Sequence, residues 1–280
     1  MINMHRSYAS IGAASTLALV VALSPTQMTR SQTNAIAAPA LVAIQFEPPA
    51  ALPPPPIVRD PGSGRSQGGA GRGCNTDRAE EQPIPLVPLA AGSKNVRWGL
   101  TTAARPTFWF HTPEGIKDGA LVVLALQDGT DKTSRRLTFQ IPPNTPPAVL
   151  SLPIPASASP LQANTPYRWE IRLFCNSGDS NTQADPSIDA PIIFSGGIQR
   201  ITPSAKLQRQ LATAKTPLDR ATAYASNGIW YDALTTLGLQ VQGKQSIDSA
   251  IVRAWSDLLR QVDLEAAAAA PIAPCCASEK

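Results

Sequence analysis

The chain has little histidine, a small net charge and few long apolar runs. Of its 280 residues, two are histidines, His5 and His111, and the formal net charge is +4. Nucleophilic catalysis needs a base beside the nucleophile, so a Ser-His-Asp or Cys-His group would depend on these histidines. The charge is too balanced for a general nucleic-acid binder, which would carry a basic stripe.

One apolar run stands near the start of the chain. Residues 11–23 are uncharged, and they are fewer than the about 20 that a membrane helix needs. A basic start and an Ala-Ile-Ala cleavage site at residues 35–37 predict a signal peptide over residues 1–37, with an uncleaved anchor as the alternative. We therefore expect export to the periplasm or the extracellular space. Removal of Arg6 and Arg30 takes 24 basic residues to 22 against 20 acidic ones, a net charge of +2, and leaves no membrane span.

Cysteine is also scarce, and its spacing matches no zinc pattern. The four cysteines are Cys74, Cys175, Cys275 and Cys276. In an oxidising compartment they are disulfide candidates, and four cysteines allow three pairings. A bond within the vicinal pair would strain the disulfide torsion. We expect Cys74 and Cys175 each to bond one of the C-terminal pair, or to bond each other. A metal or redox site is the weaker alternative, and no cofactor is expected.

Proline and glycine concentrate in residues 38–83. Proline runs at residues 48–49 and 53–56 favour extended polyproline II. Residues 62–74 are rich in glycine but lack the Gly-Lys-Ser/Thr ending of a phosphate-binding loop. This composition predicts a disordered linker over residues 38–83, which tethers the rest of the chain.

Residues 84–201 show the period of two that is typical of strands. In residues 167–175, for example, Tyr167, Trp169 and Ile171 fall on one face, and charged residues lie between them. Seven such segments are predicted, at residues 96–100, 106–113, 120–126, 135–141, 148–154, 167–175 and 191–201. Their number and spacing predict an all-β antiparallel sandwich.

One strand suggests a particular class of sandwich. Tyr167 follows Leu161 by six residues, with Pro166 at the bend. This arrangement resembles the tyrosine corner of immunoglobulin-like domains, in which the tyrosine hydroxyl bonds to upstream backbone. Cys175 lies eight residues after the tyrosine rather than two, so an antibody-type disulfide is not implied.

Residues 202–265 change to the helical period of about 3.6. Thr202 is expected to cap a first helix, and Thr216-Pro217 is expected to begin a second. The order of small, aromatic and glycine residues over residues 221–237 resembles a single tetratricopeptide helical hairpin, with Gly228 at its turn. A last helix carries its apolar face over residues 251–262. About four helices are expected, followed by a fraying tail over residues 266–280 that holds the vicinal cysteines.

Five of these motifs together resemble an exported cyanobacterial family of unknown function. They are a Gly/Arg-rich segment that ends in Cys, a Pro-Thr-Phe-Trp-Phe strand, a Tyr-Arg-Trp strand that ends in Cys, an Ile-Gln-Arg strand and a Tyr-Ala-x-x-Gly-Ile-Trp-Tyr-Asp-Ala-Leu helix pair, at residues 64–74, 106–110, 167–175, 198–200 and 224–234. The chain departs from the family at Gly196-Gly197, where Gly-Trp is expected. The resemblance implies an architecture and a location but no activity.

Chemistry is hard to find in this sequence. His111 has no carboxylate beside it in the local sequence, which favours a structural histidine. Trp109 and His111 form a possible binding or docking patch, and we expect the helices to cover Trp109. The sequence therefore predicts an exported, non-catalytic envelope protein that is an interaction or structural module, with an unknown envelope protein as partner. A hydrolase of envelope glycan or peptide is the alternative, because the fold could assemble a carboxylate pair.

Overall fold

A computed structural model describes most of the chain after the predicted signal peptide. The described residues are 43–49, 67–68, 82–90, 93, 96–128, 135–175, 191–242, 248–273 and 276–278. All of them belong to one of the two compact units of the chain, Leu41–Lys280. The predicted signal peptide, Cys74, Cys275 and most of the predicted linker lie outside the described residues.

The larger of two sheets has seven strands in the described part of the chain, and two of them are only two residues long. In spatial order they are β1 (Gln67–Gly68), β9 (Ile192–Arg200), β8 (Pro166–Cys175), β5 (Ala120–Asp128), β6 (Arg135–Ile141) and β10 (Ala277–Ser278), with β3 (Trp98–Thr101) also beside β9. The pairs run antiparallel except β3 and β9, which are parallel. The expected purely antiparallel arrangement is therefore wrong at this edge.

The smaller sheet lies against the larger one. Its strands are β2 (Ile84–Pro85), β4 (Thr107–Thr112) and β7 (Ala148–Pro153), all antiparallel. On one face of β4, Phe108 and Phe110 lie with their ring centroids 5.9 Å and 6.1 Å from those of Trp169 and Phe194 in the larger sheet. Side chains that interdigitate between two sheets form the core of a sandwich. Each of the seven predicted strands is present, as β3 to β9.

Five helices follow in the described residues. They are α1 (Ala205–Thr213), α2 (Pro217–Ala225), α3 (Trp230–Val241), α4 (Ser249–Arg260) and α5 (Glu265–Ala268). The expected start of α2 is confirmed, because Thr216 and Asp219 form a capping box with Pro217 in the first turn. The expected cap of α1 is wrong: Ser204 rather than Thr202 accepts the backbone N–H of Leu207. The expected fraying is also wrong for residues 266–268, which belong to α5.

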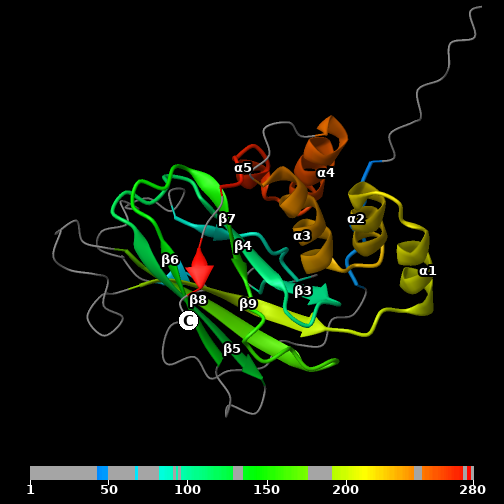
Figure 1. Ribbon diagram of the computed structural model, residues 1–280, viewed down its shortest axis with the longest axis horizontal. Coiled ribbons are helices and arrows are strands. Elements are labelled where there is room, and N and C mark those ends of the chain that lie inside the picture. Colours follow the sequence, from blue (N-terminus) through cyan, green and yellow to red (C-terminus); the bar gives the residue numbers. More distant parts are fainter. Residues whose placement is uncertain are drawn as a thin grey trace, which may run out of the picture. The chain divides into compact units, whose positions relative to one another are not determined.

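The helices cover the outer face of the smaller sheet. Figure 1 shows them gathered on one side, beside β3, β4 and β7. Residues of both sheets and of α2 to α5 belong to one large hydrophobic cluster, and a second, smaller cluster joins Leu100 of β3 to Leu207 of α1, so the described residues form a mixed α and β structure. The all-β description therefore applies to residues 84–201 and does not extend to the whole packed unit.

Part of the predicted linker also belongs to this core. Residues 43–49 lie against the helices, and Ile44 and Phe46 are 2% and 8% exposed. The linker prediction therefore does not hold for residues 43–49. The prediction from composition fails here because the segment carries two large apolar side chains between prolines. Their burial can offset the entropy lost when a short segment is ordered.

The chain departs from the family pattern at Gly196 and Gly197, and aromatic rings of other strands occupy the space beside these two glycines. A Cβ atom on Gly197 would lie 1.5 Å from the Trp98 ring, and one on Gly196 would lie 2.4 Å from the Trp169 ring. Trp98 lies on β3, directly beside Gly197 in the parallel pairing. An aromatic side chain is thus present over this part of β9, but it comes from the neighbouring strand.

Candidate functional site

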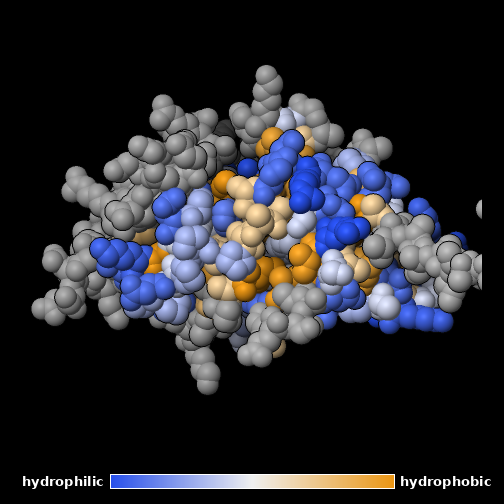
Figure 2. Space-filling view, turned by 90° about the horizontal axis from the view of Figure 1, so that it is seen from above, coloured by the Kyte–Doolittle hydropathy of each residue, from blue (hydrophilic) through white to orange (hydrophobic). Residues whose placement is uncertain are grey.

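The described surface has few large apolar residues that are well exposed. They are Leu89, Leu239 and Val252, which are far apart in the sequence. Figure 2 shows the face that is turned upward in Figure 1, where hydrophobic residues lie in small groups between hydrophilic ones. A broad apolar docking face is therefore not visible on this side, and polar hollows become the stronger candidates.

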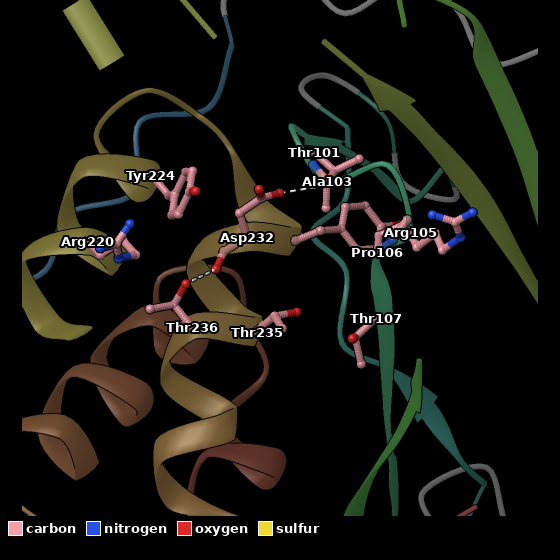
Figure 3. A pocket seen from close by; sticks show the side chains of 11 residues that line it. Thr101, Ala103, Arg105, Pro106, Thr107, Arg220, Tyr224, Asp232, Thr235 and Thr236 are labelled. Atoms are coloured by element: carbon pink, nitrogen blue, oxygen red, sulfur yellow. Dashed lines mark hydrogen bonds between the residues drawn. The ribbon is translucent and has the colours of Figure 1, made fainter. Parts of the chain in front are cut away.

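A pocket of about 150 Å³, whose wall is mostly apolar surface with polar groups set into it, lies where the end of β3 meets α2 and α3; it is called the polar pocket below after these groups. Its lining is mainly threonine, tyrosine and charged side chains, together with two small apolar residues: Thr101, Ala103, Arg105, Pro106, Thr107, Arg220, Tyr224, Tyr231, Asp232, Thr235 and Thr236. In Figure 3, Arg220 and Tyr224 come from α2 on one side, Arg105 lies on the other, and Asp232 stands between them.

Local structure explains how these side chains converge. The positive φ of 72° at Gly228 turns the chain from α2 into α3, and this conformation favours glycine. Asp232 and Thr236 are one helical turn apart on α3, so they share a face. The strand β3 ends at Thr101, directly opposite that face.

Asp232 joins the strand end to the helix. Its carboxylate accepts hydrogen bonds from the hydroxyl of Thr101 at 2.6 Å, from the backbone N–H of Thr102 at 3.1 Å and from the hydroxyl of Thr102. Burial raises the pKa of Asp232, and the bonds from the two threonines oppose this rise. Both carboxylate oxygens are thus engaged by the protein itself.

The other charged groups of the pocket are two arginines. Both are exposed, and Arg105 donates from Nε to the carbonyl of Ala158 at 2.9 Å. Within the described part of the chain, neither Arg105 nor Arg220 forms an ion pair with a carboxylate. Burial first, and the charge of Asp232 second, raise the pKa of Tyr224, so its phenol stays a hydrogen-bond donor at neutral pH.

The two guanidiniums are groups that bind anions. Guanidinium groups bind carboxylate and phosphate with charge-assisted hydrogen bonds. Asp232 is the single carboxylate among the described lining residues. General acid-base cleavage of a glycosidic bond would use a pair. The pocket is therefore best matched by a small acidic group.

The sequence-predicted patch lies elsewhere and is buried. Trp109 is 1% exposed, donates from Nε1 to Thr235 Oγ1 at 3.1 Å, and lies with its ring 6.0 Å from that of Trp255. A Cβ atom on Gly238 would lie 2.7 Å from the same ring. The helices thus cover Trp109, as expected, and it forms no exposed patch.

His111 is also buried. It lies beside Trp109 on β4, 5% exposed, and among the described residues its Nδ1 has no hydrogen-bond partner. Burial lowers its pKa, so the imidazole is neutral at pH 7. No described carboxylate bonds to it, and the structure does not bring it to the polar pocket. Within the described ranges, no three His, Cys, Asp or Glu side chains are grouped as a metal site requires.

The two described cysteines are buried. Cys175 and Cys276 are both disulfide-bonded in the structure. Cys175 pairs with Ala120 on β5, whereas the residue after Cys276 pairs with Gln140 on β6. Cys74 and Cys275 lie outside the described residues, and the predicted pairings stay a prediction.

No sequence pattern predicted the pocket. Asp232 meets Thr101 across 131 positions of the chain, a separation that no local pattern reveals. The available signal was an acidic residue in the otherwise apolar Trp-Tyr-Asp-Ala-Leu run of the predicted hairpin, at residues 230–234. A charge within such a run indicates a partner that the fold must supply.

Comparisons with known proteins give one family. A family model described as Domain of Unknown Function (DUF928) matches residues 67–272, which is more than half of the chain. The comparison with curated proteins finds no match, and the comparison with solved structures finds none either. In the residues that the structure describes, no helix is both long and apolar enough to cross a membrane.

Proposed function

We propose that this chain, which belongs to the DUF928 family, is an exported, non-catalytic envelope protein that contacts an acidic group of another envelope protein. The polar pocket between β3, α2 and α3 is the contact site in this proposal. Arg105 and Arg220 bind the acidic group. The export signal and the disulfides expected from the sequence are part of the same proposal.

One observation carries the proposal. The carboxylate of Asp232 is occupied by Thr101 and Thr102, whereas the two guanidiniums have no described carboxylate partner. The pocket therefore presents two guanidiniums that no described carboxylate pairs with directly. A carboxylate would find there the bidentate and charge-assisted bonds that arginine favours.

Two local features support the finer assignment of the fold. The hydroxyl of Tyr167 accepts the backbone N–H of Gln162 at 3.2 Å, which is the upstream bond expected of a tyrosine corner. Helices α2 and α3 pack as a hairpin around Gly228. We propose on these grounds that the sandwich is immunoglobulin-like and that the hairpin is tetratricopeptide-like. Both kinds of domain serve in protein contacts, an argument that rests on fold analogy.

A hydrolase is the second candidate, and Asp232 is the observation that favours it. A buried carboxyl group with a raised pKa has the property of a general acid. Its oxygens are engaged by the strand end, however, so a substrate would have to displace Thr101 or Thr102. We therefore rank the binding function first.

The test is affinity capture from the envelope fraction with charge-matched variants. The pocket variant is Arg105→Gln with Arg220→Gln. The control is Lys206→Gln with Arg209→Gln, which removes two exposed charges from α1. We expect the pocket variant to retain about a tenth of the captured protein, as loss of about 1.4 kcal/mol would give, and the control to retain it all. Capture should also weaken as salt is raised, because the arginines are exposed.

Two results would contradict the proposal. Equal capture by the pocket variant and the control would show that the arginines play no part. Release of products from envelope glycan or peptide by the wild-type chain, and its loss in Asp232→Asn, would favour the hydrolase instead. Thermal melts of each variant establish that it is folded before its capture is compared.

A further inference from the structure

Residues 43–49 lie on the helices in an extended conformation. Ile44 and Phe46 point into the core, whereas Gln45 and Glu47 are exposed, which is the alternation of an extended segment. The ring of Phe46 meets that of Trp230 edge-on, with centroids 4.9 Å apart. Such T-shaped contacts stabilise beyond the area they bury.

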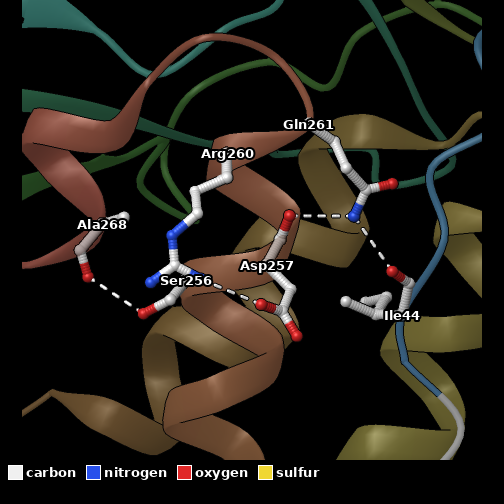
Figure 4. Close-up of polar contacts among 6 residues, drawn as sticks. All are labelled: Ile44, Ser256, Asp257, Arg260, Gln261 and Ala268. Carbon is white, nitrogen blue, oxygen red and sulfur yellow. Dashed lines mark hydrogen bonds and ion pairs between the residues drawn. The ribbon is translucent and has the colours of Figure 1, made fainter.

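The backbone of the segment is held at two points. Gln261, at the end of α4, accepts from the N–H of Phe46 through Oε1 at 2.8 Å and donates through Nε2 to the carbonyl of Ile44 at 2.9 Å. Figure 4 shows this amide beside Ile44. The N–H of Glu47 donates to the carbonyl of Ala225 at the end of α2, at 3.1 Å. These bonds recognise an extended backbone whatever its side chains, so Ile44 and Phe46 supply the selectivity.

A hollow adjoins the first described residues of the segment. A hollow of about 200 Å³ beside Ala43 and Ile44 is lined by Leu218 of α2 and by Ala250, Arg253, Ala254 and Asp257 of α4. At the other end, a Cβ atom on Gly228 would lie 2.9 Å from the carbonyl oxygen of Glu47 and 3.0 Å from Pro49. The segment therefore borders an open hollow at Ala43 and Ile44 and fits closely against Gly228 at its other end.

We propose that the groove between α2, α3 and α4 is a peptide-binding site, and that residues 43–49 are its tethered ligand. The ligand is an extended peptide with apolar side chains two residues apart, followed by Pro-Pro, as in Ile-Gln-Phe-Glu-Pro-Pro. A peptide of this pattern from outside the chain competes with residues 43–49 for the groove. The tether gives the internal segment a millimolar effective concentration, so an outside ligand binds weakly until that segment is displaced. This site is separate from the arginine pocket and does not depend on its function.

The test adds a fluorescent peptide with the sequence of residues 42–50 to the full chain. We compare the wild type with Ile44→Ser plus Phe46→Ser, which releases the internal segment, and with Gln45→Ala plus Glu47→Ala, which alters only its exposed side. Fluorescence anisotropy should show at least tenfold tighter binding to the released variant than to the wild type, and no change for the control. Adding Gln261→Ala to the released variant should weaken binding again.

A second measurement needs no substitution in the chain. An excess of unlabelled peptide should speed hydrogen exchange at residues 44–47 of the wild-type chain, because the outside peptide displaces them. A peptide with serine in place of its Ile and Phe should have no such effect. Failure of the peptide to bind the folded, released variant would overturn the proposal. If that variant does not fold, unchanged exchange in the wild type would overturn it. If residues 43–49 instead joined two wild-type chains into a dimer, the claim that they occupy the groove of their own chain would be overturned.

Discussion

The helices meet the sheets at two junctions of opposite character. At the end of β3, the junction is polar: Asp232 binds Thr101 and Thr102 beside the pocket that Arg105 and Arg220 line. On the outer face of β4, the junction is apolar: Trp109 lies between Gly238 and Trp255. Both use α3, and they involve residues only two turns apart on that helix.

The difference separates stability from recognition. Burial of a tryptophan against a glycine-lined helix contributes several kcal/mol and is insensitive to pH. A buried carboxylate contributes little net stability, because its desolvation offsets its hydrogen bonds, and it adds a dependence on pH. We infer that the apolar junction holds the helices in place, and that this support allows the polar junction to keep an open pocket with unpaired arginines.

The largest effect is expected for Trp109→Ala. The substitution leaves a cavity between β4 and α3 and removes the bond to Thr235, which should cost about 3–5 kcal/mol. Differential scanning calorimetry should show a fall in Tm of about 10 °C. Leu239→Ala, on the exposed side of the same helix, is the control and should change stability by less than about 0.5 kcal/mol. If Trp109→Ala left Tm unchanged with the helices still docked, the inference that the apolar junction holds the helices in place would fail.

A smaller loss of stability is expected for Asp232→Asn. Its dependence on pH should be opposite to that of an aspartate whose pKa is lowered by folding. The folded-state pKa of Asp232 is raised, so between about pH 4 and that pKa the folded chain holds a proton that the unfolded chain has released. Its contribution to stability therefore falls as pH rises through this window. Asn cannot titrate and loses one acceptor, so we expect a deficit of about 1 kcal/mol near pH 4 that narrows toward pH 7.

The control for Asp232 is the other aspartate of the hairpin. Backbone and side-chain hydrogen bonds from Thr216 lower the pKa of Asp219, so its contribution is present above its ordinary pKa and lost on acidification. The deficit of Asp219→Asn should therefore widen as pH rises, opposite to that of Asp232→Asn. Urea unfolding at several pH values measures both. If the stability deficit of Asp232→Asn widens as pH rises, the hydrogen bonds lower the pKa of Asp232 by more than burial raises it.

The two junctions also differ in how far the sequence predicts them. The strand that carries Trp109 is visible in the period-two pattern between Pro106 and Pro113, and the helices that cover it are visible in the 3.6-residue pattern. The partners of Asp232 are not visible, because Thr101 lies in another element and the parallel pairing of β3 has no local sign. Residues 43–49 were missed for a third reason: prolines around Ile44 and Phe46 favour an extended chain, and an extended chain can be free or bound.

The smallest effect is expected for His111→Leu, which measures the pH dependence that this titratable group adds beside Trp109. His111 shares the face of β4 with Trp109, and burial lowers its pKa below the ordinary value near 6.5. Below that pH the unfolded chain binds a proton that the folded chain does not, so wild-type stability is lost as pH falls from about 6.5. Leu fills a similar volume and does not titrate. Melts at pH 7.5 should therefore agree for the two proteins, whereas at pH 5 the wild type should melt a few degrees Celsius lower than the variant. A difference that appears at pH 7.5 and does not grow on acidification would assign His111 a packing role alone.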